Sequence, residues 1–272
     1  MMSLLTITKI EIKKSLKATL LLSIIMGLFV LMIAVIFDPD LFAEVEDIFS
    51  NYPEAILDMV GGVLDMSTFA GFYTVEFLAM IWMWLGIYFV LKAGQDIPST
   101  IENKTIDLIL SKPVKRWEFI LGRYLRFLFT ILTVIISMGL ITVLLILILP
   151  NLKDQEINAA EFITALTWAF LLILSLTTTA FFFSTFLNRK NATGAAFGIF
   201  VVFFVIGTFY TSFQENIQDI KFLSIFFYYE PARIMVSHSY ENVLRDMLIL
   251  FGYTLVLTIS SIMIFDRRDI PV

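Results

Sequence analysis

Few side chains in this chain of 272 residues could carry covalent or metal chemistry. Cysteine is absent, which excludes thiol nucleophiles and cysteine-bound zinc. His238 is the only histidine, so neither a histidine-rich metal site nor a Ser-His catalytic triad is expected. We therefore predict a protein that is not an enzyme, with no catalytic residue and no metal site of its own.

The long apolar runs of the sequence contain a few polar side chains that could handle a substrate. Glu76 lies about one helical turn into the second run, and a carboxylate within a membrane is costly and often functional. Glu76 also lies close enough to the boundary of that run to reach water. Thr177, Thr178 and Thr179 could line a polar path, or they could hydrogen-bond to neighbouring helices or to the preceding turn.

A charged segment, TIENKTIDLILSKPVKRWEF (residues 100–119), separates two strongly apolar runs. Its apolar residues recur at roughly helical spacing, and Pro113 disfavours helix at Lys112, which predicts a turn at residues 111–113. A second helix then places Trp117 at the membrane surface. A helix, a turn and a helix between two membrane anchors suit docking onto a cytosolic partner, and the alternative is a segment that only caps the bundle.

The elements that must position these residues are membrane helices. The chain is 59% hydrophobic and 16% charged, with a mean hydropathy of +0.89, whereas soluble domains are about 45–50% apolar and about 25% charged. Six segments reach the roughly 20 apolar residues that a crossing requires, and the first is too long for a cleaved signal peptide. The predicted crossings are Ala18–Phe37, Phe72–Leu91, Tyr124–Leu149, Phe162–Leu187, Ala192–Phe213 and Val243–Phe265. The predicted fold is an all-α integral membrane protein with one transmembrane domain, residues 1–272.

The basic residues predict the orientation of these helices. Of the 19 lysines and arginines, 15 fall in segments that lie on one side of the membrane, and segment 38–71 has none against eight acidic residues. Both termini and segment 92–123 are therefore expected on the cytoplasmic side of the cell membrane. No continuous basic face or nucleic-acid motif is present, so nucleic acid is not an expected partner.

The remaining segments have distinct predicted roles. Residues 1–17 are predicted to be an amphipathic helix on the membrane surface, or a simple basic flank. The acidic segment 38–71 is expected outside as a solvated face, and segment 214–242 is expected to dip into the outer leaflet or to pack over the mouth of the bundle. Gly194 and Gly198 form a G-x-x-x-G pair, which favours close helix packing within the subunit or with a second copy.

The charged segment resembles a motif of the ABC-2 type permeases, the membrane subunits of ATP-driven transporters. That family reads E-x-x-G-T-[LI]-x-L-L-L-S-x-P-[VI]-x-R after its second helix, and this chain reads ENKTIDLILSKPVKR from Glu102 to Arg116. Lys104 stands where the family usually has glycine. The ending FDRRDI, residues 265–270, is similar to the closing F-x-x-[RK]-D-[IL] of the family.

The resemblance implies that the charged segment is a coupling helix that fits a cleft on a separate ATPase subunit. The residues that it assigns to this contact are Glu102, Thr105, Asp107, Ser111, Pro113, Val114, Lys115 and Arg116. No Walker A motif occurs in the sequence, so ATP and Mg²⁺ are expected on the partner and no cofactor on this chain. It further implies a second copy of the permease, export as the direction of transport, and contact with membrane lipid; an additional external or periplasmic component is a further candidate partner.

Two other functions are compatible with a six-helix membrane chain. A non-transporting assembly or sensor protein could be built on the same scaffold, and substrate movement with ATP turnover would distinguish transport from it. An intramembrane protease or lipid-modifying enzyme would need clustered catalytic residues around a cavity. Because the sequence offers one histidine and one boundary carboxylate, the enzyme is the weaker alternative.

Overall fold

The computed structural model describes residues 4–42, 65–104, 114–153, 155 and 157–268, and in these ranges the regular structure is helical. Six stretches of helix within them are long and apolar enough to cross a membrane. They are Leu4–Ile36 (α1), Phe69–Glu102, Arg116–Ile148 (α7), Ala159–Ser184 (α8), Arg189–Thr208 (α9) and Val243–Asp266 (α11). Each overlaps one predicted crossing, which confirms the six-helix membrane fold, although several ends differ by a few residues.

The second crossing is assembled from four pieces rather than from one regular helix. They are α4 (Phe69–Tyr73), η1 (Thr74–Leu78), η2 (Trp82–Gly86) and α5 (Ile87–Glu102), of which η1 and η2 are π-helical turns. A π-helical turn adds a residue to the helical repeat and rotates the face that follows it, and such turns are frequent at functional sites. The sequence prediction of a plain helix therefore missed two local irregularities.

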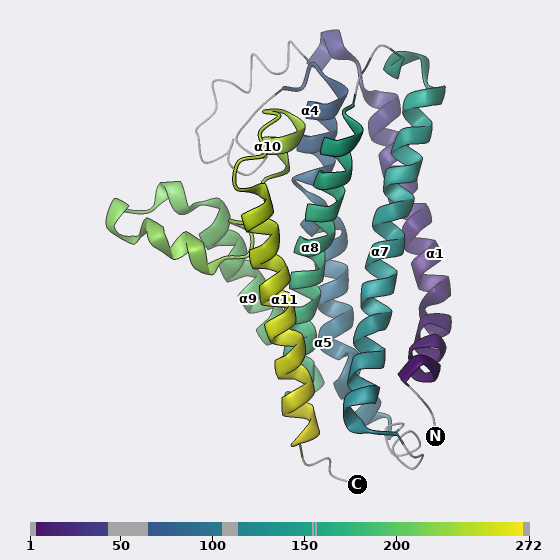
Figure 1. Cartoon of the computed structure of the whole chain (residues 1–272), viewed down its shortest axis with the longest axis vertical. Coiled ribbons are helices and arrows are strands. Elements are labelled where there is room, and N and C mark those ends of the chain that lie inside the picture. The colour runs from purple at the N-terminus through teal and green to yellow at the C-terminus, as the bar shows by residue number, and fades with distance from the viewer. Residues whose placement is uncertain (1–3, 43–64, 105–113, 154, 156, 269–272) are drawn as a thin grey trace.

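The predicted amphipathic arm, residues 1–17, is not a separate surface helix in the described range. α1 continues from Leu4 to Ile36 without a break and packs along α7, as the two helices on the right of Figure 1 show. A Cβ atom at Gly122 of α7 would lie 2.7 Å from Cγ2 of Ile7, so the glycine allows the arm to approach α7 closely. This packing explains why the arm continues the crossing instead of turning onto the surface.

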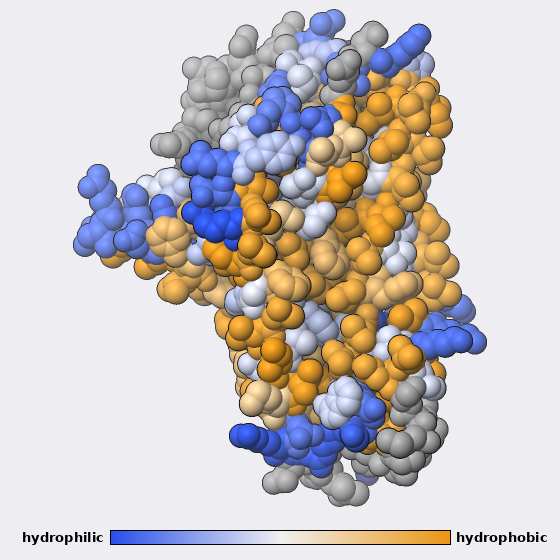
Figure 2. All heavy atoms as spheres, in the orientation of Figure 1, coloured by the Kyte–Doolittle hydropathy of each residue, from blue (hydrophilic) through white to orange (hydrophobic). Residues whose placement is uncertain are grey.

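The core of the bundle lies around α8. Residues 171–180 of this helix are all buried, and α8 contacts α5, α7, α9 and α11. Trp168 is fully buried and donates its indole N–H to the carbonyl oxygen of Tyr228 at 2.7 Å. The other crossings surround α8 and expose apolar side chains on their outer faces, which form the orange surface of Figure 2. This distribution is the one expected for helices that meet lipid on their outer side.

The segment after α9 leaves the bundle and returns to it. In Figure 1 the residues that follow α9, which include η4 (Tyr210–Ser212) and η5 (Glu215–Leu223), project sideways. The short helix α10 (Pro231–Met235) then packs against α8, α4 and η1, and the hydroxyl of Tyr229 donates to the carbonyl oxygen of Leu78 at 2.8 Å. The α10 part of segment 214–242 thus packs against one end of the bundle, and the external position of this segment stays a prediction.

At that same end the 3-10 turn η3 (Pro150–Leu152) caps the carboxyl end of α1. The side-chain amide of Asn151 donates to the carbonyl oxygens of Ala34 and Phe37, at 2.9 and 3.0 Å. These bonds satisfy two of the carbonyl groups that any helix leaves unpaired at its carboxyl end.

The described chain begins and ends at the opposite end of the bundle. The start of α1 and the end of α11 lie together at the bottom of Figure 1, with the end of α5 and the start of α7. The termini therefore lie on the same side, as an even number of crossings requires. That this side is cytoplasmic remains a prediction from the basic residues. The acidic segment 38–71 lies largely outside the described residues, which include only 38–42 and 65–71 of it.

Candidate functional site

A network of ion pairs joins α1, α5 and α7 near the end of the bundle that holds the charged segment. Arg126 of α7 stands between two carboxylates: its Nη2 lies 2.6 Å from Oδ1 of Asp96 on α5, and its Nη1 lies 3.3 Å from Oε2 of Glu11 on α1. Lys14 extends the network to the surface, with Nζ 2.7 Å from the other oxygen of Glu11. Three helices that are distant in sequence are thus connected through one guanidinium group.

Arg123 binds Asp96 a second time, from one turn earlier on α7. Its Nη1 donates to Oδ2 of Asp96 at 3.1 Å and to the backbone carbonyl of the same residue at 3.0 Å. Arg123 and Arg126 share one face of α7 because residues three apart in a helix are neighbours. The Asp96 side chain is only 10% exposed, so the aspartate is stabilised as a charged group by two guanidinium groups.

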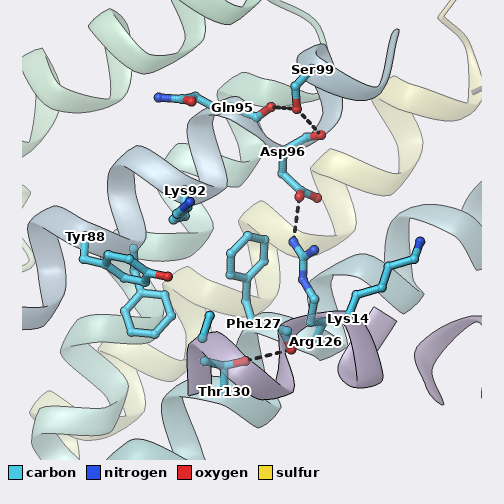
Figure 3. Close-up of a pocket in the computed structure, with 12 residues that line it drawn as sticks. Lys14, Tyr88, Lys92, Gln95, Asp96, Ser99, Arg126, Phe127 and Thr130 are labelled. Atoms are coloured by element: carbon cyan, nitrogen blue, oxygen red, sulfur yellow. Dashed lines mark hydrogen bonds and ion pairs between the residues drawn. The ribbon is translucent and has the colours of Figure 1, made fainter. Parts of the chain in front are cut away.

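A cleft of about 310 Å³ lies beside this network, between the same three helices. Figure 3 shows Lys14, Lys92 and Arg126 around it, together with the aromatic rings of Tyr88 and Phe127. The cleft is therefore both basic and partly apolar. Within the described ranges no group of three His, Asp or Glu side chains has the arrangement of a metal site.

The two ends of the charged segment flank this site. Glu102 is the last residue of α5 and is exposed, and Arg116 is the first residue of α7. Lys115 precedes α7 as an exposed residue whose backbone N–H donates to Glu118 Oε2 at 3.1 Å, and Val114 packs against the core. The other residues assigned to ATPase contact lie outside the described residues: Thr105, Asp107, Ser111 and Pro113.

Lys104 has the backbone conformation that the family motif anticipates. Its φ is +51°, in the left-handed region that glycine adopts without strain, and its N–H donates to the carbonyl oxygen of Ile101 at 2.9 Å. A left-handed residue just after a helix is a common way to end it. The lysine therefore occupies a glycine-type position at the end of α5, and the chain bends there as the charged segment begins.

Arg116 contacts its own chain rather than remaining free for a partner. Its Nη1 donates to the carbonyl oxygens of Asp266 at 3.3 Å and Arg268 at 2.8 Å, both at the end of α11. Arg268 in turn donates to the carbonyl oxygen of Thr185, which follows α8, at 2.8 Å. The start of α7 is thus bound to the ends of α8 and α11 on the side where the charged segment lies.

The candidates for a substrate pathway lie on two different elements, η1 and α8. Glu76 is exposed and lies in the π-helical turn η1. Thr177, Thr178 and Thr179 are buried in α8, and each donates its hydroxyl hydrogen bond to the carbonyl oxygen four residues earlier. Thr178 and Thr179 also lie 2.9 and 2.8 Å from the hydroxyls of Tyr124 and Tyr253. These are the hydrogen bonds to the preceding turn and to neighbouring helices that the sequence offered as the alternative to a polar path.

The G-x-x-x-G pair of α9 does not pack within the subunit. A Cβ atom built at Gly194 or Gly198 meets nothing within 4 Å. Gly194 instead borders an open cleft between α5 and α9 with Arg189, Lys190 and Glu102. The reading in which these glycines serve packing inside one subunit is therefore wrong, and the alternative with a second copy stays a prediction.

A second cluster of charges fixes the opposite end of the bundle. Arg233 of α10 binds Glu230, and its Nη1 lies 3.0 Å from Oδ2 of Asp246 on α11. Burial lowers the pKa of Arg233, but Glu230 and Asp246 outweigh it and raise the pKa above its ordinary value. His238 lies with Nδ1 2.8 Å from Oε2 of Glu161 on α8. These contacts hold the α10 region against α8 and α11.

The reading of the sequence missed Glu11 and Asp96, the two carboxylates of the buried network. In the sequence, Arg123 and Arg126 belong to the basic residues that predict the orientation of the helices, and Arg123 also stands where the family motif has a basic residue at the start of its third helix. A signal was present, because Glu11 is the one acidic residue among the four lysines of the arm, and Asp96 follows an apolar crossing whose partner helix begins with arginines. Buried arginines require carboxylate partners, and these two lie near the same membrane boundary as the arginines.

A family model described as ABC-2 family transporter protein matches residues 5–270. No curated protein matches this chain. The matched range includes all six crossings, the charged network and the charged segment.

Proposed function

We propose that this chain, which belongs to the ABC-2 family of transporter proteins, is a permease subunit that couples ATP hydrolysis by a separate ATPase to export across the cytoplasmic membrane. Membership of the family makes the chain a component of membrane transport. The coupling to ATP hydrolysis, the export direction and the ATPase partner are our proposals beyond family membership.

The observation that supports coupling is the position of the ion-pair network. The segment that resembles the coupling helix begins where α5 ends and finishes where α7 starts, and Asp96 joins these two helices through Arg123 and Arg126. Glu11 extends the connection to α1. A displacement of the segment by an ATPase would therefore move three crossings together, which is what a coupling element must do to shift the bundle between two states.

ATP and Mg²⁺ are expected on the ATPase subunit, since the sequence contains no Walker A motif. This chain would then supply the path for the substrate and no catalytic residue. The candidates for that path are Glu76 in η1 and Thr177, Thr178 and Thr179 in α8. Glu76 is exposed in η1, so a second subunit or water would have to cover its carboxylate within the membrane.

A second copy of the chain is the partner that the face around α9 suits. Gly194 and Gly198 present backbone without side chains at the surface, which allows another helix to approach closely. The adjoining α5 exposes Glu102 beside the cleft with Arg189 and Lys190. We therefore propose a two-fold assembly with two ATPase copies, in contact with membrane lipid; an external or periplasmic component is a further possible member.

Co-expression with the ATPases of the source genome, followed by purification in detergent, tests the proposal. Native mass spectrometry should then show two copies of this chain with two copies of one ATPase. A permease that associates with no ATPase would favour the alternative, a non-transporting assembly or sensor protein on the same scaffold.

A further inference from the structure

The basic cleft beside the ion-pair network has positive charge that the network does not neutralise. Glu11 and Asp96 are each held by an arginine, so their charge is already compensated. Lys92 has no ion pair with any described residue, and its closest recorded contact is the Tyr88 ring, whose centroid lies 5.9 Å away. Lys14, whose Nζ lies 2.7 Å from Oε1 of Glu11, places a second ammonium group beside the cleft, from α1.

The charges around the cleft favour an anion. Four cationic side chains, Lys14, Lys92, Arg123 and Arg126, stand against the two carboxylates of Glu11 and Asp96, which leaves a net charge of +2. The ligand must therefore be negatively charged and must accept hydrogen bonds. Figure 3 shows the Tyr88 hydroxyl pointing into the same space, where it can donate a further bond.

The cleft also has an apolar side that a small inorganic anion would not use. Phe89 and Phe127 line it, and Ala18 borders it on α1. In η2, which precedes α5, Trp84 is 40% exposed, and its ring lies 4.5 Å from the ring of Phe29 on α1. A ligand that joins an anionic group to hydrocarbon would contact both the basic and the apolar side of the cleft.

The cleft lies at the depth where lipid headgroups lie. On α1 the last lysine is Lys17, after which Leu20, Leu21 and Ile24 are exposed by 54%, 58% and 59%. Figure 2 shows this change on the right, where hydrophilic side chains over the lower part of α1 give way to an apolar surface above. The boundary between water and hydrocarbon is therefore near Lys14 and Lys17, which is the level of the cleft.

We infer that this cleft binds the phosphate headgroup of an anionic phospholipid. The ammonium groups of Lys14 and Lys92 contact the phosphate oxygens, and the acyl chains follow the exposed apolar surface beside Leu20 and Trp84. Basic pockets between membrane helices on the cytoplasmic side bind such headgroups through this combination of charge and depth. The lipid would bridge α1 and α5, which the network also joins, and this role is independent of the ATPase partner.

Lipid binding to the full-length chain in its native assembly tests the inference. Phosphatidylglycerol and phosphatidylcholine with the same acyl chains are titrated in detergent, and retained lipid is measured by native mass spectrometry. We expect preference for phosphatidylglycerol, with the affinity lowered about fivefold by Lys14→Gln and again by Lys92→Gln. Lys92→Arg should restore it.

Lys13→Gln is the matched control, because Lys13 is exposed on the same turn of α1 but does not line the cleft. It should leave the affinity within about twofold of the wild type. An equal loss from Lys13→Gln and Lys14→Gln, or equal binding of the two lipids, would overturn the inference. Displacement of the lipid by millimolar inorganic phosphate would also overturn it, since the site would then serve free phosphate.

Discussion

Asp96 is the residue on which the ion-pair network depends most. It accepts bonds from Arg123 and Arg126, and all three side chains are at most 15% exposed. Replacing a partner in a buried pair leaves the other charges uncompensated, and the typical cost is about 3–5 kcal/mol. The network therefore connects three helices, and the stability of this end of the bundle depends on all of its charges being paired.

Asp96→Asn is expected to lower the free energy of unfolding by up to about 3–5 kcal/mol, because Arg123 loses its carboxylate partner and Arg126 keeps only Glu11. Thermal unfolding of the detergent-solubilised protein should show this as a reduced Tm. Asp219→Asn is the control, since Asp219 is exposed and forms no ion pair with a described residue, and its Tm should equal that of the wild type. Equal Tm values for the Asp96 variant and the wild type would show that the pairs contribute nothing.

Lys104 supports a second prediction at this scale. A left-handed backbone costs a non-glycine residue roughly 1 kcal/mol, so Lys104→Gly should raise the stability of the α5 end by about that amount. Hydrogen exchange of the last turn of α5 would measure the gain. Faster exchange in the glycine variant than in the wild type would contradict the assignment of this position as a helix-ending residue.

Helix α9 presents two glycines, four residues apart, at which an added Cβ atom would meet nothing within 4 Å. Gly194→Leu or Gly198→Leu adds a side chain where a Cβ meets nothing within 4 Å, so the fold should tolerate either change. If a second copy packs on this face, the added side chain will separate the two helices. We expect native mass spectrometry to show single permease subunits for either variant.

Gly252→Leu is the matched control for this prediction, because Gly252 on α11 is also free of contacts within 4 Å. It should leave the two-copy assembly intact. If both α9 variants still form an assembly with two copies of the chain, the proposed interface at α9 is contradicted.

The hydropathy of the sequence was sufficient to locate the six helices. The types of the residues within each helix were not sufficient to predict its irregular turns or its full length. A run of about 20 apolar residues has essentially one outcome in a bilayer, which is why all six crossings could be predicted. The π-helical turns around Glu76 and Trp82 could not, because they arise from packing against neighbours rather than from residue type. The continuity of α1 likewise depends on Gly122, which is distant in sequence.

At the scale of the whole molecule the same limit applies to the site. The ends of the charged segment were predictable because a charged interruption between apolar runs must lie at a membrane surface. The Glu11–Arg126–Asp96 connection was not, since it joins three helices whose register is set by tertiary packing. Arg116 shows the consequence: the motif assigns it to a partner, whereas its recorded bonds are to the end of α11.

The central claim is that the segment between α5 and α7 docks an ATPase. Glu102 and Lys115 are exposed at its two ends, so replacing both with alanine removes contacts to the partner without disturbing the bundle. Arg116 is less suitable, because its loss would also release α11.

The most direct measurement is the amount of ATPase that co-purifies with the Glu102→Ala/Lys115→Ala variant, normalised to permease in the membrane. Each charge-assisted contact at a partly buried interface is worth about 1.5–3 kcal/mol, so we expect at least a tenfold loss of ATPase with normal permease insertion. Lys153→Ala, at the opposite end of the bundle, should retain the full amount. Equal recovery of ATPase with the double variant and with Lys153→Ala would contradict the account, since the charged segment would then only cap the bundle.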